Sequence, residues 1–104
     1  MKKIPQDIIR HMASYPCFYV KVWKACFNIP PGKTLSYKQI AEIIESPKAA
    51  RAVALALSKN PFVPIIPCHR VIRSDGKLGG YSAKGGINKK IKMLNYEKET
   101  GKDA

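Results

Sequence analysis

The chain has 104 residues with 45% apolar side chains, which suits one globular domain over residues 1–104 and no second one. No apolar run approaches the roughly 20 residues that a membrane span needs, and no signal-peptide stretch follows Met1, so a membrane protein is excluded and export is not expected. A net charge of +12 favours a polyanionic partner such as nucleic acid, the alternative being a basic protein with no such partner.

Two helices are expected within the first 28 residues. The lead at 1–15 carries apolar residues at helical spacing, namely Ile4, Ile8, Ile9 and Met12. The segment 16–28 carries two adjacent apolar stripes spaced i, i+4, i+8, which is typical of a helix packed in a core. Their members are Phe18, Val22, Cys26 and Tyr19, Trp23, Phe27. The Pro-Pro-Gly sequence at 30–32 then ends this helix.

Two further helices are expected at 37–44 and 48–58, capped by Ser36 and Ser46. The short link between them is typical of a helix-turn-helix, although an ordinary helical hairpin has the same spacing. The second helix favours the helix-turn-helix, because one of its faces is slim enough to approach another backbone closely. That face consists of Ala49, Ala52 and Ala56, while Val53, Leu55 and Leu57 are expected in the core.

The second half of the chain begins with an apolar run at 62–66, which is interpreted as a short buried extended segment. A turn is expected at 74–76, after Val71 and Ile72. The last helix is expected at 87–99, with an apolar face opposite its lysines, and the tail at 100–104 is expected to fray. The apolar face consists of Ile87, Ile91 and Leu94.

Cys68 is the candidate nucleophile. It directly precedes His69 and Arg70, and this cationic neighbourhood favours the thiolate, although most isolated cysteines are buried structural residues. Adjacent side chains on an extended segment point to opposite faces, so help from His69 requires a bridging water or a local turn. Cys17 and Cys26 lie within or beside helical core patterns and are interpreted as structural. Three cysteines without CxxC spacing suggest neither disulfides nor a zinc site, and no metal or cofactor is expected.

The sequence Pro-Cys-His-Arg-Val-Ile at 67–72 resembles the active-site signature of the O6-alkylguanine-DNA alkyltransferases, also called methylated-DNA-protein-cysteine methyltransferases. The resemblance covers about residues 18–97. It implies a mainly α fold, with the catalytic and DNA-binding domain at 16–97 and a tail at 98–104. This C-terminal-type domain contains a winged-helix-like helix-turn-helix and a short strand or extended active-site loop. Further landmarks fall in family order: Val22-Trp23, 29–32, Ser36-Tyr37, Ile40-Ala41, 47–53, Asn60-Pro61, 79–81 and 90–97.

The resemblance also implies the chemistry of four residues. Cys68 would accept the alkyl group from guanine O6 and keep it as a thioether, so that each molecule reacts once. His69 would activate Cys68 through a water, with Glu97 orienting the imidazole. Tyr37 would crowd the target phosphate and give a proton to the departing guanine.

For DNA binding, the resemblance implies that Arg51 fills the space left by a flipped nucleotide and that Asn60 is the hinge between the recognition helix and the cysteine loop. The helix-turn-helix would enter the minor groove of double-stranded DNA with little sequence preference, held by phosphate contacts. Further residues expected at the DNA are Ser36, Tyr37, Lys48, Ala49, Ala50 and Arg70. Those expected to line the substrate pocket are Trp23, Val71, Tyr81 and Ser82.

The chain departs from the usual family pattern in three places. Some 15 residues replace the N-terminal domain of many members, the loop after Tyr81 is about two residues longer, and Ala54 stands where a glycine is frequent.

The expected function is one-turnover transfer of an alkyl group from O6-alkylguanine in DNA, with O4-alkylthymine as a further candidate substrate. We expect a monomer in the cytoplasm, associated with the nucleoid if the source is prokaryotic. The alternative is an alkyltransferase-like protein that binds lesions without transfer, although such proteins generally replace the cysteine. A plain helix-turn-helix regulator would not need the signature at 67–70.

Overall fold

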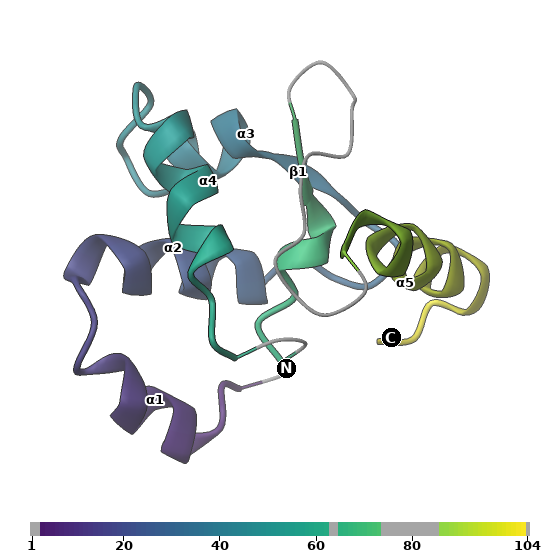
Figure 1. The fold of residues 1–104 in the computed structure, drawn as a ribbon, viewed down its shortest axis with the longest axis horizontal. Helices are drawn as coiled ribbons and strands as arrows, with labels where there is room; N and C mark the ends of the chain where they lie inside the picture. Colours follow the sequence, from purple (N-terminus) through teal and green to yellow (C-terminus); the bar gives the residue numbers. More distant parts are fainter. Residues whose placement is uncertain (1–2, 63–64, 74–85, 104) are drawn as a thin grey trace.

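The structure, a computed structural model, describes residues 3–62, 65–73 and 86–103 (Figure 1). Its described part is mainly helical, as predicted. In chain order the elements are α1 (Gln6–Met12), α2 (Cys17–Phe27), β1 (Leu35–Ser36), α3 (Tyr37–Ile43), α4 (Ala50–Ser58), the 3-10 helix η1 (Cys68–Arg70), β2 (Val71–Ile72) and α5 (Gly86–Thr100). None of these helices is long and apolar enough to cross a membrane.

Helices α1 and α2 follow the apolar periodicity of the sequence. Each begins directly after an N-cap proline, Pro5 or Pro16, which has non-helical backbone angles and whose carbonyl accepts the first helical N–H, from Ile9 at 3.1 Å or from Val20 at 3.2 Å. In one predicted stripe of α2, Val22 and Cys26 are fully buried and Phe18 is partly buried, and α2 packs against α3 and α4. Figure 1 shows α1 and α5 at opposite ends of the molecule, with α2, α3, α4 and β1 between them.

Trp23 lies at the centre of the hydrophobic core. It has no exposed surface, and its ring meets Tyr15, Phe62 and Tyr19 at centroid distances of 5.0, 5.6 and 5.8 Å. Its indole Nε1 donates a hydrogen bond of 2.9 Å to the carbonyl of Ala56, which joins α2 to α4. The prediction that Trp23 lines a substrate pocket is therefore corrected: the ring fills the core and its one polar atom is satisfied there.

Helices α3 and α4 form the predicted helix-turn-helix. Ser36 and Gln39 form a capping box at the start of α3, in which each side chain accepts the other residue's backbone N–H. The end of α3 is a Schellman motif, with Glu45 in the left-handed region at φ 63°. Two bonds close it, from the Ser46 N–H to the Ala41 carbonyl at 2.8 Å and from the Glu45 N–H to the Glu42 carbonyl at 3.1 Å.

Two details of the second helix differ from the prediction. The Schellman motif places Ser46 ahead of a further turn, so Ala49, not Ser46, is the N-cap of α4, without a side-chain hydrogen bond. Leu55 is 51% exposed, whereas Ala56 is fully buried. The reason is that α2 lies against the Ala56 side of α4 and presents Trp23 to its carbonyl, so Leu55 is turned toward solvent.

The segment at 62–66 is not extended as predicted, in its described residues. The Ile66 N–H donates to the Phe62 carbonyl at 3.0 Å, a four-residue spacing that an extended chain cannot bridge. Asn60 is the reason, because its side chain accepts from the Phe62 N–H and donates to the Ile66 carbonyl, both at 2.9 Å. The next residues enter η1 and then β2, which pairs in parallel with β1, Leu35 opposite Val71 and Ser36 opposite Ile72.

Helix α5 differs most from its predicted form. The apolar face expected in the core is largely outside, with Ile87 46% and Ile91 40% exposed. The buried residues of α5 are Lys90, Met93 and Glu97. The helix is turned this way because Glu97 and Lys90 have partners on other elements: Glu97 bonds to His69 of η1, and Lys90 bonds to the Val71 carbonyl of β2. The spacing of the apolar residues alone does not predict these polar contacts.

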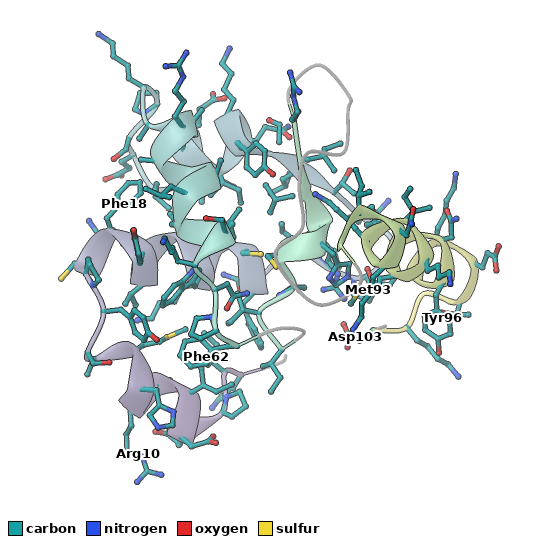
Figure 2. All side chains as sticks on the ribbon, viewed as in Figure 1. Arg10, Phe18, Phe62, Met93, Tyr96 and Asp103 are labelled. Carbon is teal, nitrogen blue, oxygen red and sulfur yellow. The ribbon has the colours of Figure 1, made fainter. Side chains whose placement is uncertain are left out.

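The segment after α5 does not fray as predicted over its described residues. Gly101, at φ 68°, ends α5, and its N–H bonds to the Glu97 carbonyl at 2.8 Å. Asp103 then forms an ion pair with Arg70. This contact holds the segment against the rest of the molecule, and Figure 2 shows Asp103 and Met93 on the side of α5 that faces the other elements.

Candidate active site and DNA-binding face

Cys68 is the first residue of η1 and is 7% exposed. Its N–H donates to the Ile66 carbonyl at 2.8 Å, and the Arg70 N–H donates to the Pro67 carbonyl at 3.0 Å, so the backbone makes a tight turn here. A local turn was one of the two arrangements by which the neighbouring His69 could assist Cys68. The turn places Cys68, His69 and Arg70 together in a buried site.

The electrostatics of Cys68 differ from the sequence-based prediction. Burial of the thiol is the largest influence and raises its pKa, while a hydrogen bond from Asn60 and the charge of Lys90 lower it. The cations adjacent in sequence do not dominate, because Arg70 is engaged by two carboxylates. The resting form is therefore the thiol, and its proton must be removed as the sulfur reacts.

His69 and Glu97 form the predicted pair. The imidazole Nε2 lies 2.9 Å from Glu97 Oε1, and the two residues are 1% and 0% exposed. Because a carboxylate only accepts, Nε2 carries the hydrogen and Nδ1 is the nitrogen that can take up a proton. Burial lowers the pKa of His69, Glu97 raises it, and Arg70 and Lys90 lower it further. His69 thus starts neutral at physiological pH, as a base must.

Arg70 was predicted at the DNA, and the structure corrects this. The residue is 3% exposed, and its guanidinium donates to Glu97 through Nε at 3.0 Å and through Nη2. It also donates to the Ile29 carbonyl at 2.7 Å and to Asp103 Oδ1 at 2.6 Å. Arg70 therefore locks η1 to α5 and to the turn after α2, and no face of it is left for a phosphate.

Lys90 belongs to the site but was not singled out from the sequence. It is fully buried, and its Nζ donates to the Val71 carbonyl at 2.9 Å. Burial lowers its pKa, whereas Cys68 and Cys26 raise it. The signal that could have revealed it is the spacing i, i+3, i+7 of Lys90, Met93 and Glu97, a helix face with one cation and one carboxylate. Asp103 had no such signal, since it lies beyond the helix.

Asn60 and Tyr37 flank Cys68. The Asn60 amide is 6% exposed and ties the end of α4 to the segment before η1, which agrees with the predicted hinge position. Tyr37 is half-buried at the start of α3, and burial is the main reason that its pKa is raised, with Cys68 contributing. A phenol with a raised pKa stays protonated at neutral pH, so it can serve as a proton donor.

The remaining residues predicted at the DNA lie around the helix-turn-helix. Lys48 and Arg51 are exposed, before and in the first turn of α4, and Ala49 and Ala50 beside them are half-buried. Ser36 accepts from Gln39 as the cap of α3, and its hydroxyl can still donate. The structure places small side chains and exposed cations at the start of α4, as a close approach to a phosphate backbone requires.

The predicted pocket is described only in part. Val71 is fully buried in β2 as part of the core, so the prediction that its side chain lines the pocket is corrected, as for Trp23. Tyr81, Ser82, the loop after Tyr81 and the turn at 74–76 lie outside the described residues. The two other thiols differ from each other: Cys26 is buried, with its pKa strongly raised by burial, whereas Cys17, expected in or beside the core, is exposed at the start of α2.

Residues 17–99 match the family described as 6-O-methylguanine DNA methyltransferase, DNA binding domain. A methylated-DNA–protein-cysteine methyltransferase of Mycobacterium tuberculosis is 54% identical over 81 residues, which cover 78% of this chain and 48% of that protein. The chain thus spans about half the length of the curated relatives it matches.

Two solved structures are similar in fold. Mycobacterium tuberculosis OGT in complex with DNA has a TM-score of 0.78 and 52% identity, covering 82% of this chain and 52% of that chain. Atl1 of S. pombe, in complex with damaged DNA containing O6-carboxymethylguanine, has a TM-score of 0.69 and 34% identity, covering 77% and 74%.

Proposed function

Because this chain belongs to the O6-methylguanine DNA methyltransferase family, we propose that it repairs DNA by direct reversal, transferring one alkyl group per molecule from O6-alkylguanine to Cys68. O4-alkylthymine is a further candidate substrate. The single observation that carries the proposal is a buried thiol in a tight turn next to a buried histidine–glutamate pair. A thiol that served only to fill the core would not need this polar neighbourhood.

The proposed reaction forms one bond and breaks one. The sulfur of Cys68 attacks the alkyl carbon while its proton passes to His69 through a water, and Glu97 stabilises the resulting imidazolium. The bond between that carbon and O6 breaks, and the guanine leaves with a proton supplied by Tyr37, which is replenished from solvent. The product is a thioether on Cys68 and unmodified guanine. No cofactor or metal takes part.

The proposed substrate is duplex DNA, held in the minor groove by the helix-turn-helix with little sequence preference. O6 of a paired guanine cannot reach a buried sulfur, so the nucleotide must be flipped out, which costs a few kcal/mol. Arg51 would fill the space left in the stack, and Lys48 would contact a phosphate. We propose that the protein acts as a monomer, and in the cytoplasm, at the nucleoid if its source is a prokaryote.

The similarity to Atl1 supports one second candidate, a protein that binds the lesion and does not transfer the alkyl group. Both candidates share the DNA-binding face, so binding assays do not separate them. The retained Cys68, with His69 and Glu97 in place behind it, favours transfer.

Intact mass spectrometry after incubation with a duplex containing O6-methylguanine tests the proposal. We expect one added methyl group, mapped to the peptide of Cys68, and none on the Cys68→Ala variant, which should still bind the duplex. Cys17 is the internal control, because it is the most accessible thiol of the three. An unchanged mass with retained lesion binding would establish the second candidate instead, and a methyl group on Cys17 alone would contradict both the site and the mechanism.

A further inference from the structure

Asp103 reaches the buried cluster from outside the segment that matches the family, which ends at residue 99. The turn at Gly101 and a bond from the Lys102 N–H to Thr100 Oγ1 at 3.1 Å direct the chain back toward η1. The carboxylate of Asp103 then accepts from Arg70 Nη2 at 2.6 Å while remaining 41% exposed. The segment after α5 thus contributes a charge to the active-site cluster.

Arg70 is shared between two carboxylates. Its Nη2 donates to both Glu97 and Asp103, and its Nε donates to Glu97 Oε1, the same oxygen that faces His69 Nε2. A guanidinium that bonds to Glu97 draws negative charge away from the imidazole. A second carboxylate on the same guanidinium partly offsets that pull, which leaves Glu97 a better partner for a protonated His69.

The formal charges make the same point. Glu97, Asp103 and Arg70 sum to −1 while His69 is neutral, and they become balanced when His69 takes up a proton. The neighbouring Lys90 and Cys68 sum to +1 with the thiol and are balanced once it becomes the thiolate. Proton movement from Cys68 to His69 therefore neutralises both groups. Without Asp103, the sum over Glu97, Arg70 and a protonated His69 would be +1 after the same movement.

We propose that Asp103 is a positioning residue for the alkyl transfer: acting through Arg70, it supplies the counter-charge that lets His69 accept the proton of Cys68. This inference rests on the proposed function. Among the described residues, the charged groups that act on His69 are Glu97 and Lys90 from α5 and Arg70 from η1, and Asp103 is linked to it through Arg70. The effect is accordingly indirect and screened by solvent, so a moderate change is expected from its removal.

The test compares Asp103→Asn, which keeps the shape and removes the charge, with Asp103→Glu, which keeps the charge. Glu99→Gln is the matched control, because Glu99 is an exposed carboxylate near the end of α5, four residues before Asp103. Two quantities are measured in each full-length variant: the titration of His69 by NMR, which does not depend on activity, and the single-turnover transfer rate as a function of pH.

We expect Asp103→Asn to lower the pKa of His69 by about half a unit and to slow transfer about threefold at neutral pH, since one unit corresponds to a tenfold change. Asp103→Glu should restore both quantities toward the parent, and Glu99→Gln should match the parent in both. A slower and less stable Asp103→Asn protein in which His69 titrates as in the parent would overturn the inference, because Asp103 would then only hold the segment in place.

Equal behaviour of Asp103→Asn and the parent would also overturn it. Failure of the parent itself to transfer would instead refute the proposed function. In that case the titration of His69 still decides whether Asp103 acts on the imidazole.

Discussion

The cluster behind Cys68 and the start of α4 differ in whether their charged side chains are buried or exposed. In the cluster behind Cys68, the polar and charged side chains are buried and each has a hydrogen-bond partner: His69 and Arg70 bond to Glu97, and Lys90 donates to the Val71 carbonyl. At the start of α4, Lys48 and Arg51 are exposed beside alanines. A buried charge is costly to leave without its partner, whereas an exposed one acts through the ligand it meets. Substitutions in the first region should therefore change chemistry or stability, and those in the second should change DNA engagement alone.

The largest expected effect is on the chemical step. His69→Ala should slow alkyl transfer by about 10² to 10⁴, the usual range for a lost general base, without abolishing it. Because the pKa of Cys68 is raised by burial, the parent rate should rise as pH increases from neutral, and the variant should depend on pH more steeply. Single-turnover rates across pH measure both effects. A variant that reacts at the parent rate would remove His69 from the mechanism.

Glu97→Gln should produce a smaller loss in the same assay, because the amide still holds the ring but does not stabilise its charge.

Arg70 provides the sharpest contrast in stability. Arg70→Ala should lower the free energy of unfolding by about 3 to 5 kcal/mol, because Glu97 would be left as a buried carboxylate without its main cation. Arg51→Ala, which removes the same charge from an exposed site, should change the free energy of unfolding by less than about 0.5 kcal/mol. Urea denaturation of the two variants tests the pair. Similar losses for the two variants would show that the buried and exposed arginines contribute equally to stability.

Arg51 should matter only when a base stack is opened. Arg51→Ala should slow reaction with a duplex substrate by roughly tenfold, because the wedge offsets part of an unstacking cost of a few kcal/mol. The free base O6-benzylguanine, if it enters the pocket, should react at nearly the parent rate. Equal losses on both substrates would assign Arg51 a structural role.

The salt dependence of DNA binding separates exposed cations from buried ones. If roughly five to eight phosphates are contacted, log affinity should fall with log salt with a slope of about −4 to −7. Lys48→Ala should reduce that slope by about one. Binding should show little preference among unmodified sequences. A slope near zero, or strong sequence preference, would indicate a different partner or a sequence-reading regulator.

The smallest expected effect is at the turn between the two helices. Glu45 occupies the left-handed position of a Schellman motif, where glycine is the usual residue. Glu45→Gly should therefore stabilise the protein by about 0.5 to 1 kcal/mol, observed as a higher Tm. Glu42→Gly, in the right-handed helical region of α3, should do the opposite. A lower Tm for Glu45→Gly would contradict the strain argument.

The sequence by itself determined the helices and the helix-turn-helix, and it singled out the candidate nucleophile. These features are local: prolines start α1 and α2, a capping box starts α3, and a six-residue signature identifies Cys68. The roles implied for His69 and Glu97 also agree with their observed contact, although the two residues are 28 positions apart.

Only the tertiary structure decided which face of α5 is buried and where Arg70 points. Apolar spacing favoured Ile87 and Ile91 as core residues. In the structure the opposite face is buried, because Glu97 and Lys90 have partners on η1 and β2. Arg70 looked available to a phosphate until Glu97 and Asp103 were brought to it from more than 25 residues away. Ion pairs between distant segments leave no local pattern in the sequence. The reason is that the sequence around a charged residue is the same whether its partner is solvent, DNA or another side chain.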